Sequence, residues 1–240
     1  MPLHEEIYQQ LLNQINTGEY LPGDKIPGEI ELCSQFSVSR QPIRQAVLRL
    51  VSEGYLQRKR RAGTFVTIPK LENKSIQFIA SYHEEMAKKG LHPKTQVMQQ
   101  KILRNDEVLC RKLEIPLDSK IFALTRLRII PEGNRDIPQV LTSVYLPYDK
   151  YSFLLEYDFE EIPLYEALKE HRVFVSDVVR EMEIRLLTAR QSKFLDAGVH
   201  SPAHFITSCG RNQDGEMVEY AESYYPADRN KFIIRIHREE

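Results

Sequence analysis

The sequence predicts an α+β protein with two parts: a small helical part that ends in a hairpin, and a larger part built on a mainly antiparallel sheet. Three observations support this division. Three amphipathic helical patterns precede two short strand patterns within residues 1–67. Residues 68–75 are polar, contain a proline and show no periodicity, which indicates a linker. Strand patterns then outnumber helical ones over residues 76–240, which we expect to form a second domain.

The composition excludes several classes of protein. Of the 240 residues, 42% are apolar and 28% are charged, which is ordinary for a globular protein that buries a core. No apolar run approaches the roughly 20 residues that a membrane-spanning helix needs. Residues 1–6 carry no secretory signal, and the three widely spaced cysteines do not form a disulfide framework. We therefore expect a cytoplasmic protein with no membrane partner.

The first two helices are predicted from the spacing of apolar side chains. Residues 4–17 place isoleucine and leucine on one helical face, and the Leu-Pro-Gly-Asp turn at 21–24 follows that helix. A second, shorter helix is expected over residues 28–36, and the Ser-Val-Ser sequence at 37–39 ends its pattern.

A third helix and a hairpin complete the first part. Ser39 is a favourable N-cap for a helix of about 15 residues that ends at Gly54. Two runs of strand-forming residues follow, at 55–57 and 64–67, separated by the basic stretch 58–61. Three helices followed by a basic hairpin form a winged helix-turn-helix, whose third helix enters the major groove of DNA.

The charge of the first part supports a nucleic-acid interface. The net charge of the chain is −1, yet the segment from Ser39 to Arg61 contains seven basic residues and only one acidic residue. A local positive segment on a nearly neutral protein is typical of a surface that binds nucleic acid. A solvated basic helix face is the alternative.

The second part predicts a sheet with helices beside it. Helical patterns occur near 82–90, 105–113, 163–171 and 188–196. Extended patterns occur near 95–103, 120–130, 138–146, 173–187, 203–212, 217–225 and 231–236.

Motifs in both parts resemble those of one known family. In the first part they are Leu21-Pro22-Gly23-Asp24-Lys25-Ile26-Pro27, Val38-Ser39-Arg40, Arg44-Gln45-Ala46, Glu53-Gly54-Tyr55-Leu56 and Gly63-Thr64-Phe65-Val66. This series resembles the GntR-type DNA-binding domain. In the second part they are Met86-Ala87-Lys88-Lys89-Gly90, Arg126-Leu127-Arg128, Tyr145-Leu146-Pro147, Leu164-Tyr165, Val218-Glu219-Tyr220, Ser223-Tyr224-Tyr225 and Asp228-Arg229. These resemble the effector-sensing UTRA domain of the HutC-like branch of that family, whose fold is related to chorismate lyase.

The resemblance implies a function as well as a fold. It implies a homodimeric transcription regulator, in most cases a repressor, that binds an inverted-repeat operator in double-stranded DNA. It also implies that a small metabolite, often a phosphorylated sugar, releases the regulator from DNA.

The predicted DNA contacts lie on the third helix and the hairpin. Arg40 and Arg44 are four residues apart, so they project from one helical face, and arginine can bind guanine through two hydrogen bonds. Gln41 can pair with adenine, and Ser39 at the helix N-terminus suits a phosphate. The resemblance places base contacts at Arg40, Gln41 and Arg44 and a wing contact at Gly63. The full predicted set is Ser39, Arg40, Gln41, Arg44, Arg49, Arg60, Arg61 and Gly63.

The predicted effector site is centred on two arginines of one strand. Arg126 and Arg128 alternate, so both side chains leave the same face of the sheet, about 7 Å apart. Two guanidinium groups so close repel each other unless an anion or an acid lies between them. The alternative is that one pairs with a surface glutamate and the other is solvated.

Further residues complete this predicted site. Glu219 and Tyr225 match family positions that contact the effector, and a surface carboxylate and a core tyrosine are the alternatives. The full predicted set is Ser81, Tyr82, His83, Arg126, Arg128, Thr142, Tyr165, Glu219 and Tyr225. Thr142 and Pro163 replace residues that many sugar-phosphate sensors carry. We therefore expect a small anionic effector, either a phosphorylated sugar or a related acid.

Enzymatic functions receive little support from the sequence. It contains no G-x-S-x-G, GxGxxG, Walker or CxxC motif, and we expect neither a cofactor nor a metal. A chorismate lyase-like enzyme with an accessory DNA-binding domain is the principal alternative. A DNA-binding architectural protein without an effector is another.

Overall fold

The computed structural model describes residues 2–60, 62–67, 70–73, 82–87, 91–104, 106–132 and 135–234. They form two compact units whose boundary along the chain falls at Leu71, except that the short segment Glu132–Arg135 is grouped with the first unit. No helix in these ranges combines the length and the apolar character needed to cross a membrane.

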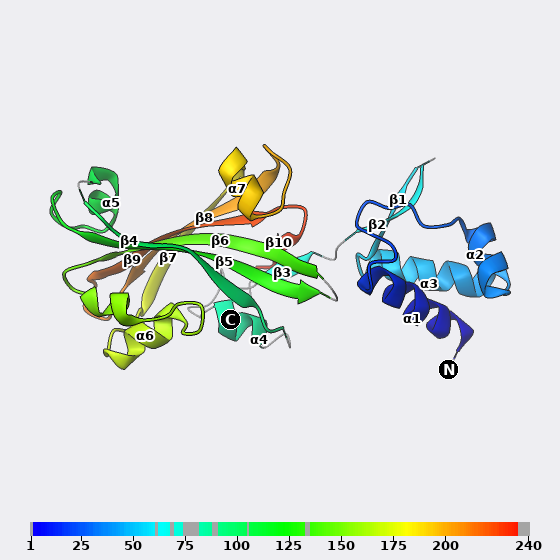
Figure 1. Cartoon of the computed structure of the whole chain (residues 1–240), viewed down its shortest axis with the longest axis horizontal. Helices are drawn as coiled ribbons and strands as arrows, with labels where there is room; N and C mark the ends of the chain where they lie inside the picture. The colour runs from blue at the N-terminus through cyan, green and yellow to red at the C-terminus, as the bar shows by residue number, and fades with distance from the viewer. Residues whose placement is uncertain are drawn as a thin grey trace, which may run out of the picture. The chain divides into compact units, whose positions relative to one another are not determined.

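The first unit packs three helices against a two-stranded hairpin (Figure 1). Its elements are α1 (Leu3–Asn16), α2 (Glu29–Phe36), α3 (Arg40–Ser52), β1 (Leu56–Lys59) and β2 (Gly63–Val66). Ile7, Leu11, Leu32, Ile43 and Leu50 are almost completely buried and form the centre of the core. The predicted order of helices and hairpin is confirmed.

The hairpin extends further into the basic stretch than the sequence predicts. In its antiparallel register, Arg58 lies opposite Thr64 and Lys59 opposite Gly63, which restricts the tip to residues 60–62. Gly63 has a φ of 121°, a conformation that glycine adopts without strain. A Cβ at this position would lie 2.5 Å from Cε of Lys25, a flexible side chain that can move aside, so the backbone conformation is what favours glycine here.

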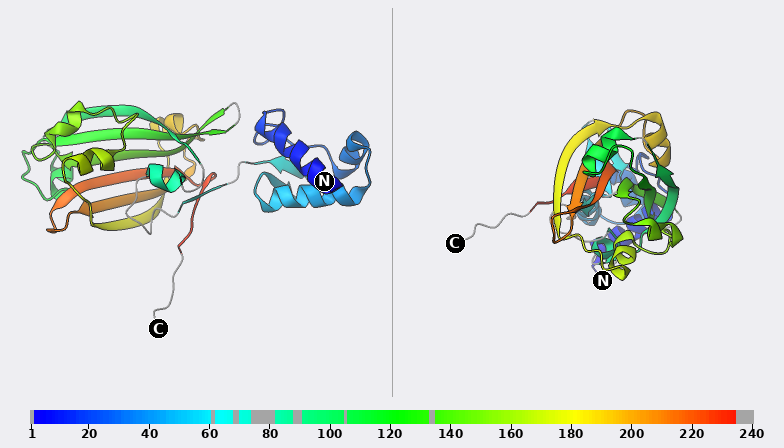
Figure 2. Two further views of the ribbon diagram at one scale, coloured as in Figure 1. Left: turned by 90° about the horizontal axis from the view of Figure 1, so that it is seen from below. Right: turned by 90° about the vertical axis from the view of Figure 1, so that its left-hand side faces the viewer.

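The second unit is built on a six-stranded sheet with strand order β4-β5-β6-β9-β8-β7. Its strands are β4 (Lys94–Leu103), β5 (Ile121–Glu132), β6 (Arg135–Pro147), β7 (Asp177–Leu186), β8 (Pro202–Arg211) and β9 (Met217–Pro226). The sheet is strongly curved (Figure 2). The α+β class predicted for this part is confirmed.

Helices cover both faces of this sheet (Figure 1). The helices are α4 (Tyr82–Ala87), α5 (Glu107–Lys112), α6 (Leu164–Glu170) and α7 (Ala189–Phe194). Leu164 of α6 packs with Phe122 and Val144 on one face. On the other face Leu109 of α5 packs with Ile121. Phe194, the last residue of α7, packs in a separate cluster with Leu187. The sheet thus has two apolar faces, as strands between helix layers require.

Three elements differ from the sequence prediction. Part of the predicted linker, Leu71–Asn73, forms strand β3, which pairs with β10 (Asn230–Phe232). Its polar composition concealed this strand because Asn73 is buried and finds its partner 157 residues away, in Asn230. A 3-10 helix, η1 (Ser152–Glu156), was not predicted, and β7 begins four residues later than its extended pattern.

Candidate functional site

The N-terminal end of α3 presents polar side chains to solvent. Ser39 occupies the N-cap position, but its side chain forms no capping hydrogen bond. Arg40, Gln41 and Arg44 are exposed, and the side chain of Arg40 retains 68% of its accessible surface. These side chains are therefore accessible to a partner at the end of the helix where the sequence predicts base contacts.

Glu29 connects this helix to the hairpin. Its Oε2 lies 3.4 Å from Nε of Arg40, and its Oε1 accepts a hydrogen bond of 2.8 Å from Arg58. One carboxylate from α2 thereby restrains arginines of α3 and β1. The sequence analysis missed Glu29 because no spacing rule places α2 beside the hairpin.

Arg49, which the sequence analysis assigns to the DNA contact, lies among side chains of its own unit. Its guanidinium lies 3.9 Å from the centre of the Tyr8 ring and donates hydrogen bonds to Glu5 and Glu53. Tyr8 also donates a hydrogen bond of 2.6 Å to Glu53. Because these contacts hold α3 against α1, the guanidinium is engaged within the protein.

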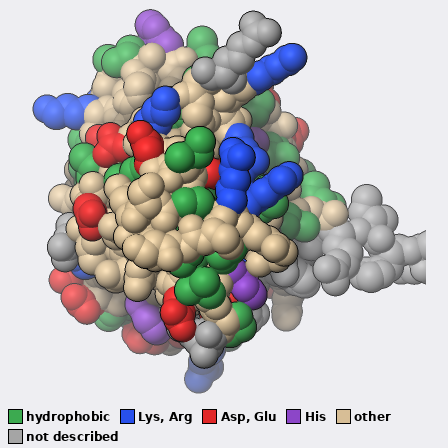
Figure 3. Space-filling model, turned by 90° about the vertical axis from the view of Figure 1, so that its right-hand side faces the viewer, with side chains coloured by type: hydrophobic (Ala, Val, Ile, Leu, Met, Phe, Trp, Pro, Cys, Tyr) green, Lys and Arg blue, Asp and Glu red, His purple; other side chains and the backbone are tan. Residues whose placement is uncertain are grey.

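The hairpin contributes the remaining basic residues of this surface. Arg60 is exposed, and Gly63 begins the second strand of the hairpin. Arg61 lies outside the described residues. Figure 3 shows basic side chains projecting from the face that turns toward the viewer, with acidic side chains beside them.

A second candidate site is a pocket in the second unit, with an empty volume of about 900 Å³ that includes its open mouth. Seven of the predicted effector residues line it: Tyr82, Arg126, Arg128, Thr142, Tyr165, Glu219 and Tyr225. Ser81 and the side chain of His83 lie outside the described part of the chain. The floor is the sheet, while α4 and the start of α6 contribute Tyr82, Leu164 and Tyr165.

The register of the sheet explains why these residues meet. Arg180 lies opposite Ser208, Ser208 opposite Ala221, and Ala221 opposite Val144, so one row of side chains crosses four strands. Thr142 and Ser223 form the next cross-strand pair, with a 3.0 Å hydrogen bond between their hydroxyls. Side chains in such rows share one face of a sheet.

Arg126 and Arg128 lie on the same face, as predicted, but neither is solvated. They retain only 5% and 7% of their accessible surface. Arg128 donates a hydrogen bond of 3.0 Å to Thr95, whereas Nε and Nη1 of Arg126 have no partner among the described residues. Burial and then the charge of Arg128 lower the pKa of Arg126 well below its ordinary value. Burial also lowers the pKa of Arg128, to about 10.

Glu219 is the acidic group of the pocket. Tyr165 donates a hydrogen bond of 2.5 Å to its Oε1. Burial raises the pKa of Glu219, against the Tyr165 hydrogen bond and the charges of Arg126 and Arg180, which lower it. Burial, followed by the charge and the hydrogen bond of Glu219, raises the pKa of Tyr165, so its hydroxyl remains a donor. The predicted alternative of a surface carboxylate does not apply, because Glu219 is buried.

The pocket also contains residues that sequence reasoning did not select. Arg180 and Ser208 line it, and Nε of Arg180 donates a hydrogen bond of 3.3 Å to the Ser208 hydroxyl. Both lie in segments that were predicted as extended. Their convergence depends on β7 and β8 being neighbours in this register, which alternation within a single strand does not reveal.

Family comparisons identify the type of domain to which each unit belongs. Residues 3–66 match the family described as bacterial regulatory proteins, gntR family, and residues 88–231 match the UTRA domain. The chain belongs to the GntR family. GntR regulators with a UTRA domain bind operator DNA through the first domain and a small-molecule effector through the second.

Individual relatives of this GntR chain are transcription repressors. It is 30% identical to the HTH-type transcriptional repressor NagR of Bacillus subtilis (strain 168), over 97% of this chain and 94% of that protein. It is 26% identical to the mannosyl-D-glycerate transport/metabolism system repressor MngR of Escherichia coli (strain K12), over 97% of this chain and 95% of that protein. The crystal structure of PhnF from Mycobacterium smegmatis is similar, with a TM-score of 0.73 and 26% identity, over 97% of this chain and all of that chain. These relatives are regulators, so the enzyme alternative is not favoured.

Proposed function

We propose that this chain is a repressor that binds an inverted-repeat operator and leaves it when a small anionic metabolite enters the pocket. We infer that the metabolite is a phosphorylated sugar or a related sugar acid. The observation that carries the proposal is the buried guanidinium of Arg126, whose Nε and Nη1 have no partner among the described residues.

The energetics of burial favour an anionic occupant. A buried charge without a partner is strongly unfavourable, and an anion that accepts its hydrogen bonds removes much of that cost. The residues that line the pocket carry three guanidinium groups and one carboxylate. With Glu219 ionised, their net charge is +2. This charge is opposite in sign and similar in size to that of a phosphate monoester near pH 7, which is about −1.5 to −2.

The neutral polar groups of the pocket suit a hydroxylated body. Thr142, Ser208, Ser223 and Tyr225 line the wall between Arg126 and Arg180. Hydroxyl groups both donate and accept hydrogen bonds, as sugar hydroxyls do. The relative MngR is named for mannosyl-D-glycerate, a sugar joined to a carboxylic acid, which supports this chemical class.

The DNA-binding proposal rests on the exposed end of α3 and the hairpin. We assign base contacts to Arg40, Gln41 and Arg44, and phosphate contacts to Ser39, Arg60, Arg61 and Gly63. Arg49 is withdrawn from this set because its guanidinium is held by Tyr8, Glu5 and Glu53.

A second copy of the chain completes the proposed regulator. We assign the contact to edge strand β7, where Met182, Ile184 and Leu186 are exposed and share one face of the strand. Antiparallel pairing of two β7 strands about Glu183 would set Glu181 of each copy opposite Arg185 of the other. A homodimer with two DNA-binding units matches an inverted repeat.

A thermal-shift screen tests the proposed effector. Sugar phosphates, sugar acids and uncharged sugars are added to the full chain and to the Arg126→Met variant. A ligand that binds only the folded state raises the melting temperature according to RT ln(1 + [L]/Kd). We expect anionic sugars to stabilise the parent chain, not the variant, and then to release it from DNA in a gel-shift assay. Stabilisation by uncharged sugars alone, or equal stabilisation of the variant, would contradict the proposal.

A further inference from the structure

A buried pair of asparagines connects the start of the second unit to its end. The amide of Asn73 on β3 donates a hydrogen bond of 2.9 Å to Oδ1 of Asn230 on β10, and both residues are almost completely buried. The carbonyl of Asn73 accepts a hydrogen bond of 3.1 Å from the Ile233 amide. Residues 70–73 directly follow, in sequence, the segment that leaves the DNA-binding unit. These hydrogen bonds join β10 directly to this part of the chain.

Asn230 is in turn bonded to the two strands that form the pocket. Its amide donates hydrogen bonds of 3.1 Å to the carbonyls of Gln139 on β6 and Pro226 on β9. The neighbours of these residues in sequence, Val140 and Tyr225, line the pocket. One side chain thus contacts the backbone of both pocket strands and the side chain of Asn73.

An apolar contact runs beside these hydrogen bonds. The ring of Phe232 on β10 packs edge-on against the ring of Tyr225, with 5.1 Å between the ring centres. Tyr82, Val140 and Ile206, which also line the pocket, belong to the same cluster. A ligand that draws Tyr225 toward its anionic group would thus also shift the ring of Phe232, which packs against Tyr225.

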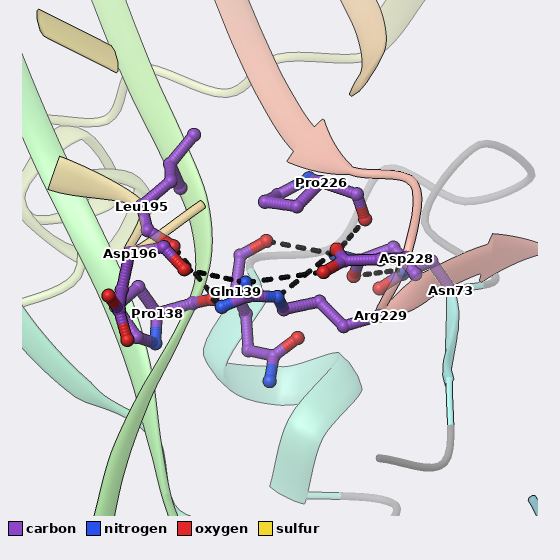
Figure 4. Close-up of polar contacts among 9 residues, drawn as sticks. Asn73, Pro138, Gln139, Leu195, Asp196, Pro226, Asp228 and Arg229 are labelled. Atoms are coloured by element: carbon purple, nitrogen blue, oxygen red, sulfur yellow. Dashed lines mark hydrogen bonds and ion pairs between the residues drawn. The ribbon is translucent and has the colours of Figure 1, made fainter. Parts of the chain in front are cut away.

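Arg229 fixes the position from which this path acts. Its guanidinium donates hydrogen bonds to the carbonyls of Pro138 and Leu195 at 3.1 Å and of Asp196 at 2.9 Å (Figure 4). These bonds secure the start of β10 to β6 and to the end of α7. The adjacent Asn230 is therefore held close to β6 and β9. Small displacements of these two strands should change the position of Asn230 as well.

We propose that the Asn73–Asn230 pair couples occupancy of the pocket to the segment that leads to the DNA-binding unit. The proposal rests on the proposed function, because it requires an anion to bind beside Arg126 and Arg128. Binding of that anion tightens Tyr225 and β9 around it, and Asn230 passes the change to β3. The coupling is reciprocal, so the state of β3 also changes the affinity of the pocket.

Hydrogen exchange with inorganic phosphate as the probe tests this coupling. The full-length parent is compared with Asn73→Leu, which keeps the side-chain volume but removes the amide; Asn73→Ser replaces it where the leucine variant does not fold. In the parent, phosphate is expected to slow exchange about fivefold or more in peptides that cover 70–73 and 230–234. In the variant, thermal stabilisation by phosphate persists, while the slowing at 70–73 is lost.

A matched control separates coupling from general destabilisation. Asn212 lies in the β8–β9 turn, where its Oδ1 accepts hydrogen bonds from the amides of Asp214 and Glu216. Asn212→Ala removes two exposed asparagine hydrogen bonds away from the path, so the slowing at 70–73 should survive. An unchanged response of 70–73 in Asn73→Leu, or no response in a parent that binds phosphate, would overturn the coupling alone. Phosphate binding that is absent, or unaffected by Arg126→Met, would overturn the proposed function and this inference together.

Discussion

The arginines at the start of α3 and the arginines of the pocket have the same side chain, but the first are exposed to solvent and the second are buried. Arg40 and Arg44 project from α3 into solvent, whereas Arg126 and Arg128 are buried under α4 and α6. An exposed cation acts over a long range and is screened by salt, while a buried cation acts over a short range and is screened little. The first arrangement suits a polyanion that must be found and scanned, and the second suits one small anion of defined shape.

The difference in environment also predicts different energetic consequences. Removing an exposed arginine leaves the folding free energy nearly unchanged, because water solvates it in both states. Removing a buried arginine that lacks a partner takes away a desolvation penalty. Binding and stability should therefore change together in the pocket and separately on the DNA-binding surface.

The largest expected difference between the two sites is their response to salt. Operator affinity should fall about a thousandfold or more between 50 and 200 mM salt, provided the dimer neutralises about six phosphates. Affinity for the anionic effector should change much less over the same range, because the pocket is shielded from bulk ions. Fluorescence anisotropy of a labelled operator and calorimetry of the effector measure the two slopes. Parallel slopes would remove the comparison.

Replacement of Arg126 by methionine should affect both ligand binding and stability. We expect effector affinity to fall by about 2–5 kcal/mol, because a buried charge-assisted contact is lost. The unliganded variant should unfold at the same or a higher temperature, because an unpaired buried charge is gone. Calorimetric titration and thermal melts check both outcomes. A lower melting temperature in the absence of ligand would contradict this expectation and would show that the attraction between Arg126 and Glu219 outweighs the cost of burying the guanidinium.

Replacement of Arg44 by alanine should weaken operator binding by roughly 1–3 kcal/mol and relax the base preference at one position. The melting temperature should not change, in contrast to the pocket variant. Binding to the operator and to duplexes altered at single positions measures the effect. Equal losses on every sequence would assign Arg44 to phosphate instead of base contact.

Replacement of Glu29 by glutamine should have a smaller effect on the same assay. The variant weakens the restraint that Glu29 places on Arg40 and Arg58, so we expect a loss of about 0.5–1.5 kcal/mol on the specific operator. Non-specific binding should stay the same or increase, because one negative charge leaves the surface. A specific affinity above that of the parent would contradict a positioning role.

The smallest effect concerns acid stability of the DNA-binding unit. Burial raises the pKa of Glu53, but the hydrogen bonds from Tyr8 and Arg49 and the charge of Arg49 hold it below the usual value of a glutamate. Ionised Glu53 therefore contributes to the free energy of unfolding at pH values above the ordinary glutamate pKa. This contribution is lost as the pH falls through the lowered pKa of Glu53. Glu53→Gln should cost a few tenths to about 1 kcal/mol near pH 7, after allowance for solvent screening, and progressively less in acid. Urea unfolding across pH values tests this, with Glu6→Gln on the exposed side of α1 as the control.

Local patterns were sufficient to predict most elements and the central pair of the pocket. The period of apolar residues identified α1 and α3, and alternation along one strand placed Arg126 and Arg128 on one face. Both inferences need only neighbouring residues, which explains their success. What local patterns cannot supply is the partner of each face.

The residues that the sequence analysis missed depend on contacts between distant segments. Arg180 reaches the pocket through the register of β7 with β8, and Glu29 reaches the DNA-binding surface through the packing of α2 beside β1. Arg49 resembled a surface cation until Tyr8 and Glu53 were found beside it. Such tertiary contacts decide the role of a polar side chain more strongly than its residue type.

The alternation of the pocket floor has a consequence for the history and the engineering of this protein. Thr142, Ser208 and Ser223 line the cavity. On each of these strands, the residues directly before and after them point to the other face of the sheet. A substitution at one of these positions changes recognition chemistry without disturbing the packing behind it. Under the proposed function, single substitutions at these positions are expected to change which metabolite the pocket binds, and the same positions are natural starting points for a designed biosensor.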